Sequence, residues 1–411
     1  MKLKKSQKNT PDPTDTEPQD VLVDEAEGSE NEDDLGEVDP LLLGRSVVAG
    51  TDWTSDTILR QLEKGNITLD PVFQRRDAWN DKRKSKFIES LILGLPIPQI
   101  VLAESRENRG TFIVIDGKQR LLALWRFAGK SDDPAFAPLT LTGLTVREDL
   151  NGVAFNDLQT ESQLGRYLSA FENSTIRTVV VRNWQSEKVL YIIFHRLNTT
   201  SVPLSPQELR QALHPGEFLR FAAEYSESSP GLQRALNLSK PDFRMRDVEL
   251  LVRYFAYKNF IDDYSGNLKE FLDGTCKVLN KNWKARKAQL KGQAAELESA
   301  IRSVYSIFGT TGAFRKWEGT RFEKRFNRAA FDVMAYFFSE KSIREAARAK
   351  KRRISLEFRD LCSNNERFRR SLETTTKSVE ANSIRFSVWG HSLENILGIP
   401  VRIPKIRRRG K

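Results

Sequence analysis

The sequence predicts an α+β protein, in which a small mixed α/β domain is followed by a mostly α-helical domain. Short runs rich in β-branched residues occur at 98–105, 110–117 and 175–184, with helical patterns between them. From residue 187 onward, apolar residues recur almost continuously at helical spacing. A chain of 411 residues is long enough for two domains, each with its own hydrophobic core.

The predicted domain boundaries follow changes in composition along the chain. Residues 1–45 are rich in Pro, Asp, Glu, Ser and Thr, so we expect a disordered acidic arm there. The mixed α/β domain is expected over 46–185, with order beginning near Trp53, and the helical domain over 186–400. A basic cluster at 401–411 is interpreted as a tail.

Each predicted element has a local signal. Helices are expected at 55–67 and at 81–96, the latter closed by Gly94 and Pro96, with an extended segment at 69–79 between them. Strands 98–105 and 110–117 flank a turn at 108–110, and a helix follows from 118 to about 128. The later helices are expected at 187–198, 205–216, 217–228, 246–261, 267–283, 284–308, 323–339, 341–372 and 391–397.

Charge is distributed unevenly along the chain. Residues 1–40 hold 13 Asp/Glu and 4 Lys/Arg, whereas the remainder holds 62 Lys/Arg and 42 Asp/Glu, a balance of +20. A body this basic suits a polyanion such as DNA, because neutralising phosphates releases counterions. The alternative is a well-solvated surface. The acidic arm either shields the body from non-specific nucleic acid or acts as a solubilising tail.

Composition also narrows the cellular setting. No apolar run reaches the roughly 18 residues of a membrane span, and the basic N-terminus has no apolar core of a secretory signal behind it. Cys276 and Cys362 are the two cysteines, without a CxxC or Cys/His grouping. These features predict a cytoplasmic protein without a membrane segment or a structural zinc site.

The stretch VIDGKQRLLALWRF places Asp116, Gly117, Lys118, Gln119 and Arg120 where a strand is expected to turn into a helix. One interpretation is an anion-binding corner. Glycine allows close backbone approach, the helix N-terminus attracts phosphate, and the two cations add charge-assisted hydrogen bonds. Glutamine would hydrogen-bond the ligand, and the aspartate would hold a metal-bound water or orient a nucleophilic water. The alternative is an aspartate N-cap, a glycine turn and solvated cations.

Two further segments supply polar residues of interest. FQRRDAW offers Gln74, Arg75 and Arg76 with Trp79, and in a strand Gln74 and Arg76 would point to one side and Arg75 to the other. HRLNTTSVPLSPQELRQALHPG offers Asn198 and Glu208. Ser205 stands three residues before Glu208, the spacing of a capping box, so Glu208 is either a helix cap or a catalytic residue that handles a metal or a water.

The segments FQRRDAW, SLILGLPIPQIVL, VIDGKQRLLAL and FHRLNTTSVPLSPQELRQALHPG follow one another in an order that resembles the GmrSD restriction endonuclease N-terminal-domain family. The resemblance covers about residues 53–275. It implies a ParB/sulfiredoxin-like domain of a bacterial DNA-restriction or anti-phage system. The family's DGQQR signature falls on 116–120, with Lys118 in place of the usual glutamine. That lysine either strengthens phosphate binding or disturbs a polar role of the glutamine.

The resemblance implies a regulatory protein that binds a nucleoside triphosphate with Mg²⁺. It leaves the identity of the nucleotide and its hydrolysis open. Asp116 and Glu208 are the candidate catalytic residues, and no metal ligand is assigned. DNA and a separate nuclease protein are the implied partners. The candidate nucleotide-binding residues are Gln74, Arg75, Asp116, Gly117, Lys118, Gln119, Arg120 and Asn198.

Two alternatives stay open beside this hypothesis: a non-catalytic DNA-binding protein, and a metal-dependent nuclease that uses the ParB-like domain itself. An HNH-type nuclease site is not expected in this chain, because its three histidines, His195, His214 and His391, have no histidine or cysteine cluster around them. The phosphate-loop, dinucleotide, zinc-protease and nucleophile-elbow motifs are also missing from the sequence.

Overall fold

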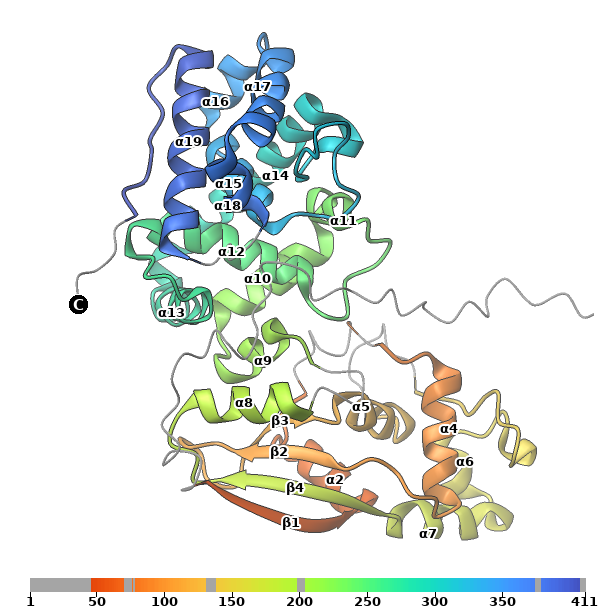
Figure 1. The fold of residues 1–411 in the computed structure, drawn as a ribbon. Coiled ribbons are helices and arrows are strands. Elements are labelled where there is room, and N and C mark those ends of the chain that lie inside the picture. The colour runs from red at the N-terminus through yellow and green to blue at the C-terminus, as the bar shows by residue number, and fades with distance from the viewer. Residues whose placement is uncertain are drawn as a thin grey trace, which may run out of the picture.

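The computed structural model describes residues 46–69, 76, 78–130, 138–197, 204–373 and 378–406. Within them, a small mixed sheet at the N-terminal side is followed by a mostly helical region, which confirms the predicted α+β class (Figure 1). The acidic arm predicted over 1–45 lies outside the described residues. Of the predicted tail, 401–406 is described, and Val401 and Ile406 are buried against the helical region.

The sheet has four strands in the order β1-β4-β2-β3. They are β1 (Val47–Thr54), β2 (Ile100–Glu104), β3 (Phe112–Asp116) and β4 (Thr175–Arg182). β2 and β3 form the predicted antiparallel hairpin, β1 runs antiparallel to β4, and β2 runs parallel to β4.

Strand β1 was not predicted, since order was expected to begin only near Trp53. Its sequence, VVAGTDWT, carries few buried apolar residues, and Val47 and Val48 are 48% and 62% exposed. All eight residues of β1 are nonetheless paired with β4, from Val47 opposite Arg182 to Thr54 opposite Thr175. The ladder with a distant strand, rather than a local pattern, therefore specifies this element.

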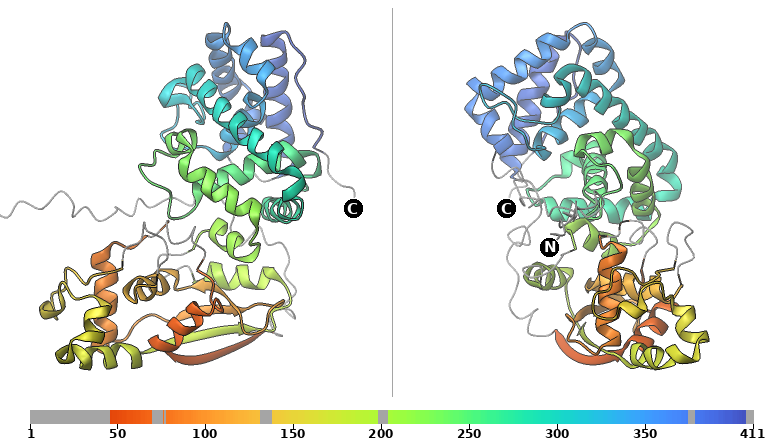
Figure 2. Two further views of the ribbon diagram at one scale, coloured as in Figure 1. Left: turned by 180° about the vertical axis from the view of Figure 1, so that it is seen from behind. Right: turned by 90° about the vertical axis from the view of Figure 1, so that its right-hand side faces the viewer.

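Helices cover both faces of the sheet. Alternation along β2 sends Ile100 and Leu102 to one apolar cluster and Val101 and Ala103 to another. The first face packs against α2 (Ser55–Glu63), α4 (Asp81–Ile92), α5 (Lys118–Phe127), α6 (Phe155–Thr160) and α7 (Gly165–Asn173). The second face packs against α8 (Glu187–Leu197) and α9 (Pro206–Leu213), so the sheet lies between two helical layers (Figure 2).

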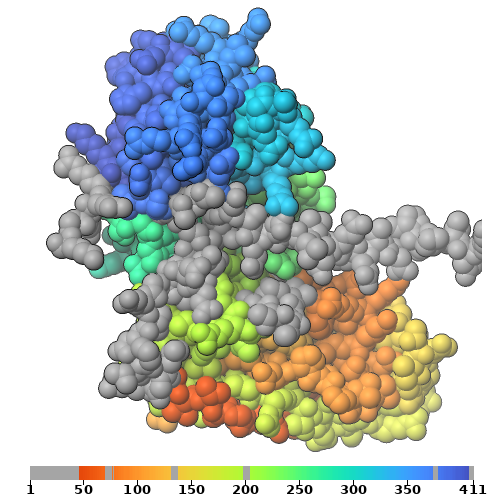
Figure 3. All heavy atoms as spheres, viewed as in Figure 1, coloured from red at the N-terminus to blue at the C-terminus, as the bar shows by residue number. Residues whose placement is uncertain are grey.

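The chain from residue 217 onward forms helices around a separate apolar cluster. Helix α12 (Arg246–Phe260) lies at its centre, because every residue from 247 to 257 is buried. The other helices are α10 (Glu217–Ser228), α11 (Pro230–Leu236), α13 (Leu268–Lys281), α14 (Trp283–Gly312), α15 (Arg328–Phe338), α16 (Lys341–Ala347), α17 (Lys351–Asn364), α18 (Glu366–Glu373) and α19 (Val379–Leu397). They form the upper part of the molecule, above the sheet and its helices (Figure 3).

Two helix predictions need correction. The single amphipathic segment expected at 341–372 is divided into α16, α17 and α18. Each of these helices turns its own apolar residues, such as Ile343, Phe358 and Phe368, into the common core, which one straight helix could not do. The short helix expected at 391–397 is the last part of the longer α19.

Candidate functional site

The predicted corner lies at the junction of β3 and α5. Gly117 is the N-cap of α5 and has a left-handed backbone, with φ of +97°. A Cβ atom at this position would stand 2.9 Å from Ile100 Cγ1, so both the conformation and the space require glycine. The alternative with Asp116 as the N-cap is wrong, because Gly117 occupies that position and supplies no side-chain cap. The partial positive charge of the helix N-terminus therefore faces the corner without a capping carboxylate.

Arg120 is a buried guanidinium with an unused donor. Its Nη2 donates to Asp116 Oδ2 at 2.8 Å and to the carbonyl oxygen of Gln99 at 2.9 Å. Arg120 is only 5% exposed, and its Nε has no hydrogen-bond partner among the described residues. A buried N–H group without a partner is costly, and of the described arginines with such an Nε only Arg120 lines the pocket at the corner, where an acceptor would satisfy it.

Lys118 and Glu208 form a buried ion pair across the corner. Lys118 Nζ lies 2.6 Å from Glu208 Oε1, and both side chains are 4% exposed. Glu208 Oε2 accepts from the backbone N–H of Ser205 at 2.7 Å, and Ser205 Oγ accepts from the N–H of Glu208. The predicted capping box is confirmed. Both oxygens of Glu208 are engaged, so this carboxylate supports α9 and balances Lys118.

Gln119 fastens a neighbouring segment to the corner. Its Oε1 accepts from the backbone N–H groups of Ala78 and Trp79, at 3.3 and 3.2 Å. The ring of Trp79 in turn packs edge-on against Phe87, and the guanidinium of Arg83 lies over it at 4.9 Å. The amide of Gln119 therefore positions Ala78 and Trp79, the last two residues of FQRRDAW, in the wall of the corner.

These groups surround a pocket of about 230 Å³. All five residues of the predicted DGKQR motif line it, together with Ala78, Trp79, Arg83, Phe87, Pro98, Leu204, Glu208 and Phe243. The lining holds three cations and two carboxylates. Arg83 is exposed and has no carboxylate partner in the part of the chain that the structure describes. The pocket thus combines an excess positive charge with a helix N-terminus, which favours an anion.

Three predicted ligand-binding residues, Gln74, Arg75 and Asn198, lie outside the described residues, so their roles stay predictions. The neighbouring Arg76 was noted in the sequence but was not assigned a binding role. It is fully buried and donates to Asp247 Oδ1 at 2.6 Å, to the carbonyl of Asp242 at 2.8 Å and to Ser226 Oγ at 3.0 Å. The doubled arginine in FQRRDAW was the visible signal, but the partners of Arg76 are 147 or more residues away in sequence.

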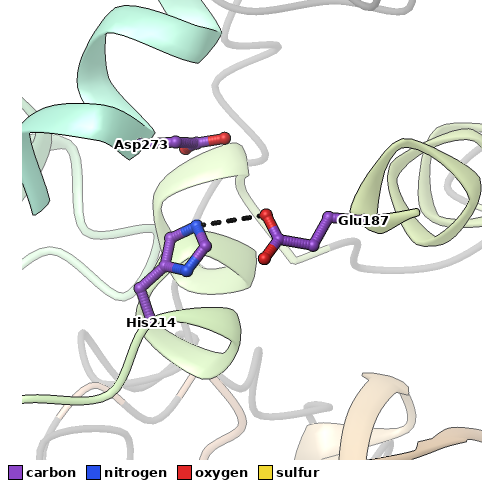
Figure 4. A group of neighbouring side chains, drawn as sticks. All are labelled: Glu187, His214 and Asp273. Carbon is purple, nitrogen blue, oxygen red and sulfur yellow. Dashed lines mark ion pairs between the residues drawn. The ribbon is translucent and has the colours of Figure 1, made fainter. Parts of the chain in front are cut away.

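A second polar cluster joins the sheet layers to the helical region. Glu187, His214 and Asp273 approach one another from α8, the end of α9 and α13, with ligand atoms within 4.8 Å of one another (Figure 4). Arg210 and Lys269 both donate to Asp273 at 2.7 Å. Burial alone would raise the pKa of Asp273, but these two cations outweigh it and hold that pKa below its usual value.

His214 is the neutral member of this cluster. Burial lowers the pKa of His214, against the attraction of Asp273 and Glu187 for a proton. Its Nε2 lies 3.5 Å from Glu187 Oε2, which also pairs with Lys277 at 3.2 Å. Both carboxylates of the cluster therefore already have basic partners, and the arrangement works as an ion-pair network that connects three helices rather than as a cation site.

Comparison with known proteins matches residues 57–215 to the family model described as the N-terminal domain of the GmrSD restriction endonuclease. The matched range contains every pocket-lining residue except Phe243. No curated protein and no solved structure matches the chain. Within the described residues, no helix is both long and apolar enough to cross a membrane.

Proposed function

We propose, starting from the membership of residues 57–215 in the GmrSD N-terminal-domain family, that this protein is a nucleotide-binding regulatory component of a bacterial DNA-restriction or anti-phage system. The observation that carries the proposal is the buried Nε of Arg120, which lacks an acceptor beside the uncapped N-terminus of α5. A phosphate oxygen satisfies that donor and the helix end together.

The pocket residues divide the work of holding a triphosphate. Gly117 lets a phosphate approach the backbone of α5, and Arg120 offers its Nε while Asp116 and Gln99 hold its other end. Lys118 is paired with Glu208, which partly neutralises the positive charge of the pocket before a nucleotide binds. When a nucleotide is bound, the ammonium group contacts both Glu208 and a phosphate. Arg83 and Trp79 form the outer wall, where a base or ribose packs.

The donor set fits Mg²⁺ carried by the nucleotide. Mg²⁺ usually keeps several waters and takes one or two carboxylate oxygens besides the phosphates. Asp116 offers its second oxygen, Oδ1, because Oδ2 is paired with Arg120. Glu208 is not offered, since both of its oxygens are engaged. Asp116 is therefore the single residue proposed to hold a metal-bound water or to orient a nucleophilic one.

A path from the pocket to the helical region involves Arg76, Ala78 and Trp79. Gln119 holds the backbone of Ala78 and Trp79, while Arg76 is bonded to α10 and α12. A ligand that shifts the first turn of α5 therefore pulls on a segment that is anchored in the helices. We propose that this segment passes the nucleotide state to a DNA-cleaving partner or to DNA.

The test is equilibrium binding of ATP, GTP, CTP and UTP, with Mg²⁺, to the wild type and to Arg120→Gln. Loss of a charge-assisted contact of about 1.5–3 kcal/mol weakens binding by about 10- to 150-fold. Arg126→Gln is the matched control, because Arg126 lies on the same helix and pairs with Asp81 outside the pocket lining. Absence of nucleotide binding by the folded wild type, or equal binding by both variants, contradicts the proposal.

A non-catalytic DNA-binding protein is the second candidate, and the +20 balance of residues 41–411 favours it. Its signature is DNA affinity that falls steeply with salt and does not respond to any nucleotide. A nuclease within the corner itself has less support. Glu208 is committed to Lys118 and Ser205, which leaves one carboxylate for a metal among the described pocket residues.

A further inference from the structure

A second, larger hollow lies far from the corner, between α14 and the helices α16 and α17. Its volume is about 590 Å³. Its lining consists of Ser299, Arg302, Ser303, Ser306, Ile307, Lys341, Arg344, Glu345, Ala347, Arg348 and Lys351. One wall, from α14, presents serine hydroxyls and Arg302, and the other presents four further cations. Five cations and a single carboxylate therefore face one groove.

Arg302 and Arg344 each make hydrogen bonds within the fold, but two of the five groove cations make none among the described residues. Arg348 and Lys351 are exposed, and neither side chain has an ion pair or hydrogen bond in the described part of the chain. Lys341 Nζ lies 3.9 Å from Glu345 Oε1, and both side chains are exposed, so this ion pair contributes little to stability. Buried arginines elsewhere behave differently, since Arg253, for example, is paired with Asp332 at 2.5 Å.

Arg344 is the fixed point of the basic wall. Its Nη1 donates to the carbonyl oxygens of Phe338 and Ser339, at 2.8 and 2.5 Å, at the end of α15. These bonds hold the guanidinium at the groove, and its other nitrogens stay available. Opposite, Ser303 and Ser306 carry hydroxyl groups without a side-chain partner among the described residues. Cations and hydroxyls around one hollow are the groups that contact phosphate and sugar in protein–DNA complexes.

The shape and composition of the groove select among phosphate ligands. The α14 wall from Ser299 to Ile307 is about 12 Å long, at about 1.5 Å per residue. Duplex DNA carries one negative charge per about 1.7 Å when both strands are counted, or about seven over that length, and about half of these lie on the strand that faces the groove. Among the described residues that line the groove none is aromatic, so they offer no platform on which bases of a single strand could stack.

We infer that the groove between α14 and α16 binds the phosphate backbone of duplex DNA without reading its sequence. The site lies outside residues 57–215 and does not depend on the proposed nucleotide site. With four cations in excess, the logarithm of DNA affinity falls with the logarithm of salt concentration at a slope of about −3.6 from this groove.

The test measures binding of a labelled duplex of mixed sequence to the full chain over a range of salt concentrations. The variant Arg348→Gln/Lys351→Gln removes two exposed groove cations. We expect its affinity at low salt to fall about tenfold or more and its salt slope to fall by about two. Ser306→Glu places a negative charge on the opposite wall and lowers affinity as well. These positions are surface positions, and thermal unfolding checks that the fold is unchanged.

Lys284→Gln/Lys291→Gln is the matched control. It removes the same charge from exposed positions on α14, the helix that forms the opposite wall, outside the groove lining. We expect a much smaller effect on affinity. An equal loss in groove and control variants would assign DNA binding to overall charge and overturn the inference. Unchanged binding by the groove variant would overturn it too. Preference for a single strand over a duplex, lost in the groove variant, would refute the duplex assignment.

Discussion

The buried pair of Lys118 and Glu208 allows a quantitative prediction about the corner. At 2.6 Å and with both side chains 4% exposed, the pair is scarcely screened by solvent. With an effective dielectric constant of about 20, its attraction is about 6 kcal/mol. Removing two ions from water costs several kcal/mol for each ion, so the pair contributes little net stability. Breaking it is costly, however, because one buried charge is left without a partner.

We therefore expect Lys118→Met to lower the free energy of unfolding by about 3–5 kcal/mol, and Glu208→Gln to lower it by a similar amount. The double variant should be more stable than either single variant. The introduced methionine then fills the space of the lysine stem, and the amide oxygen of the introduced glutamine can still accept from the N–H of Ser205. The coupling energy between the two changes should exceed about 2 kcal/mol.

Urea unfolding of the wild type, both single variants and the double variant measures this coupling. The exposed pair of Lys130 and Glu63, at 2.9 Å, is the control, and its two analogous substitutions should each cost less than about 1 kcal/mol. Additive effects of Lys118→Met and Glu208→Gln, within about 0.5 kcal/mol, would refute the reasoning, since the two charges would then not depend on each other.

Three further outcomes follow from single residues. Gly117→Ala should lower the free energy of unfolding in urea by about 2–5 kcal/mol and abolish nucleotide binding, because the backbone is strained and the new methyl group meets the neighbouring strand. Gly152→Ala is the control: Gly152 has φ of +88° but open space around it, so this change should cost only about 1–2 kcal/mol. Arg76→Met should lower the free energy of unfolding by about 3–5 kcal/mol because it strands the buried Asp247, and a wild-type unfolding curve would contradict this. Burial lowers the pKa of His214, so the unfolded chain binds a proton at this residue at a higher pH than the folded protein does. The free energy of unfolding should therefore fall as pH drops below about 6.5, by at most about 1.4 kcal/mol per pH unit. His214→Gln should remove that part of the pH dependence.

Local chemistry made the elements around the corner predictable. Strands β2, β3 and β4 are indicated by β-branched residues, and α5 is indicated by apolar residues at helical spacing directly after Gly117. The capping box of Ser205 and Glu208 is a signal three residues long, and the structure contains it as predicted. Each of these features depends on the conformational preferences of a few neighbouring residues.

The partners of the corner residues could not be predicted in the same way. Lys118 meets Glu208 across 90 residues of sequence, and Arg76 meets Asp247 across 171. The sequence left Glu208 as either a cap or a catalytic residue, and the fold makes it both a cap and the counter-ion of a lysine. Strand β1 illustrates the same limit, because its residues form a strand only through their pairing with β4.

Residue patterns along the chain are sufficient to predict the α+β class, the glycine corner between strand and helix, and the excess of positive charge. Which charges neutralise one another inside the protein, and which face a ligand, follows from the folded arrangement alone. Lys118 is paired with a buried carboxylate, Arg120 keeps one donor without an acceptor, and the cations of α16 and α17 line a groove with α14. Helical and strand periodicity and helix caps depend on residues that are close in sequence. The electrostatic energy of a charged side chain depends instead on its burial and on its distance from other charges, which the chain brings together only when it folds.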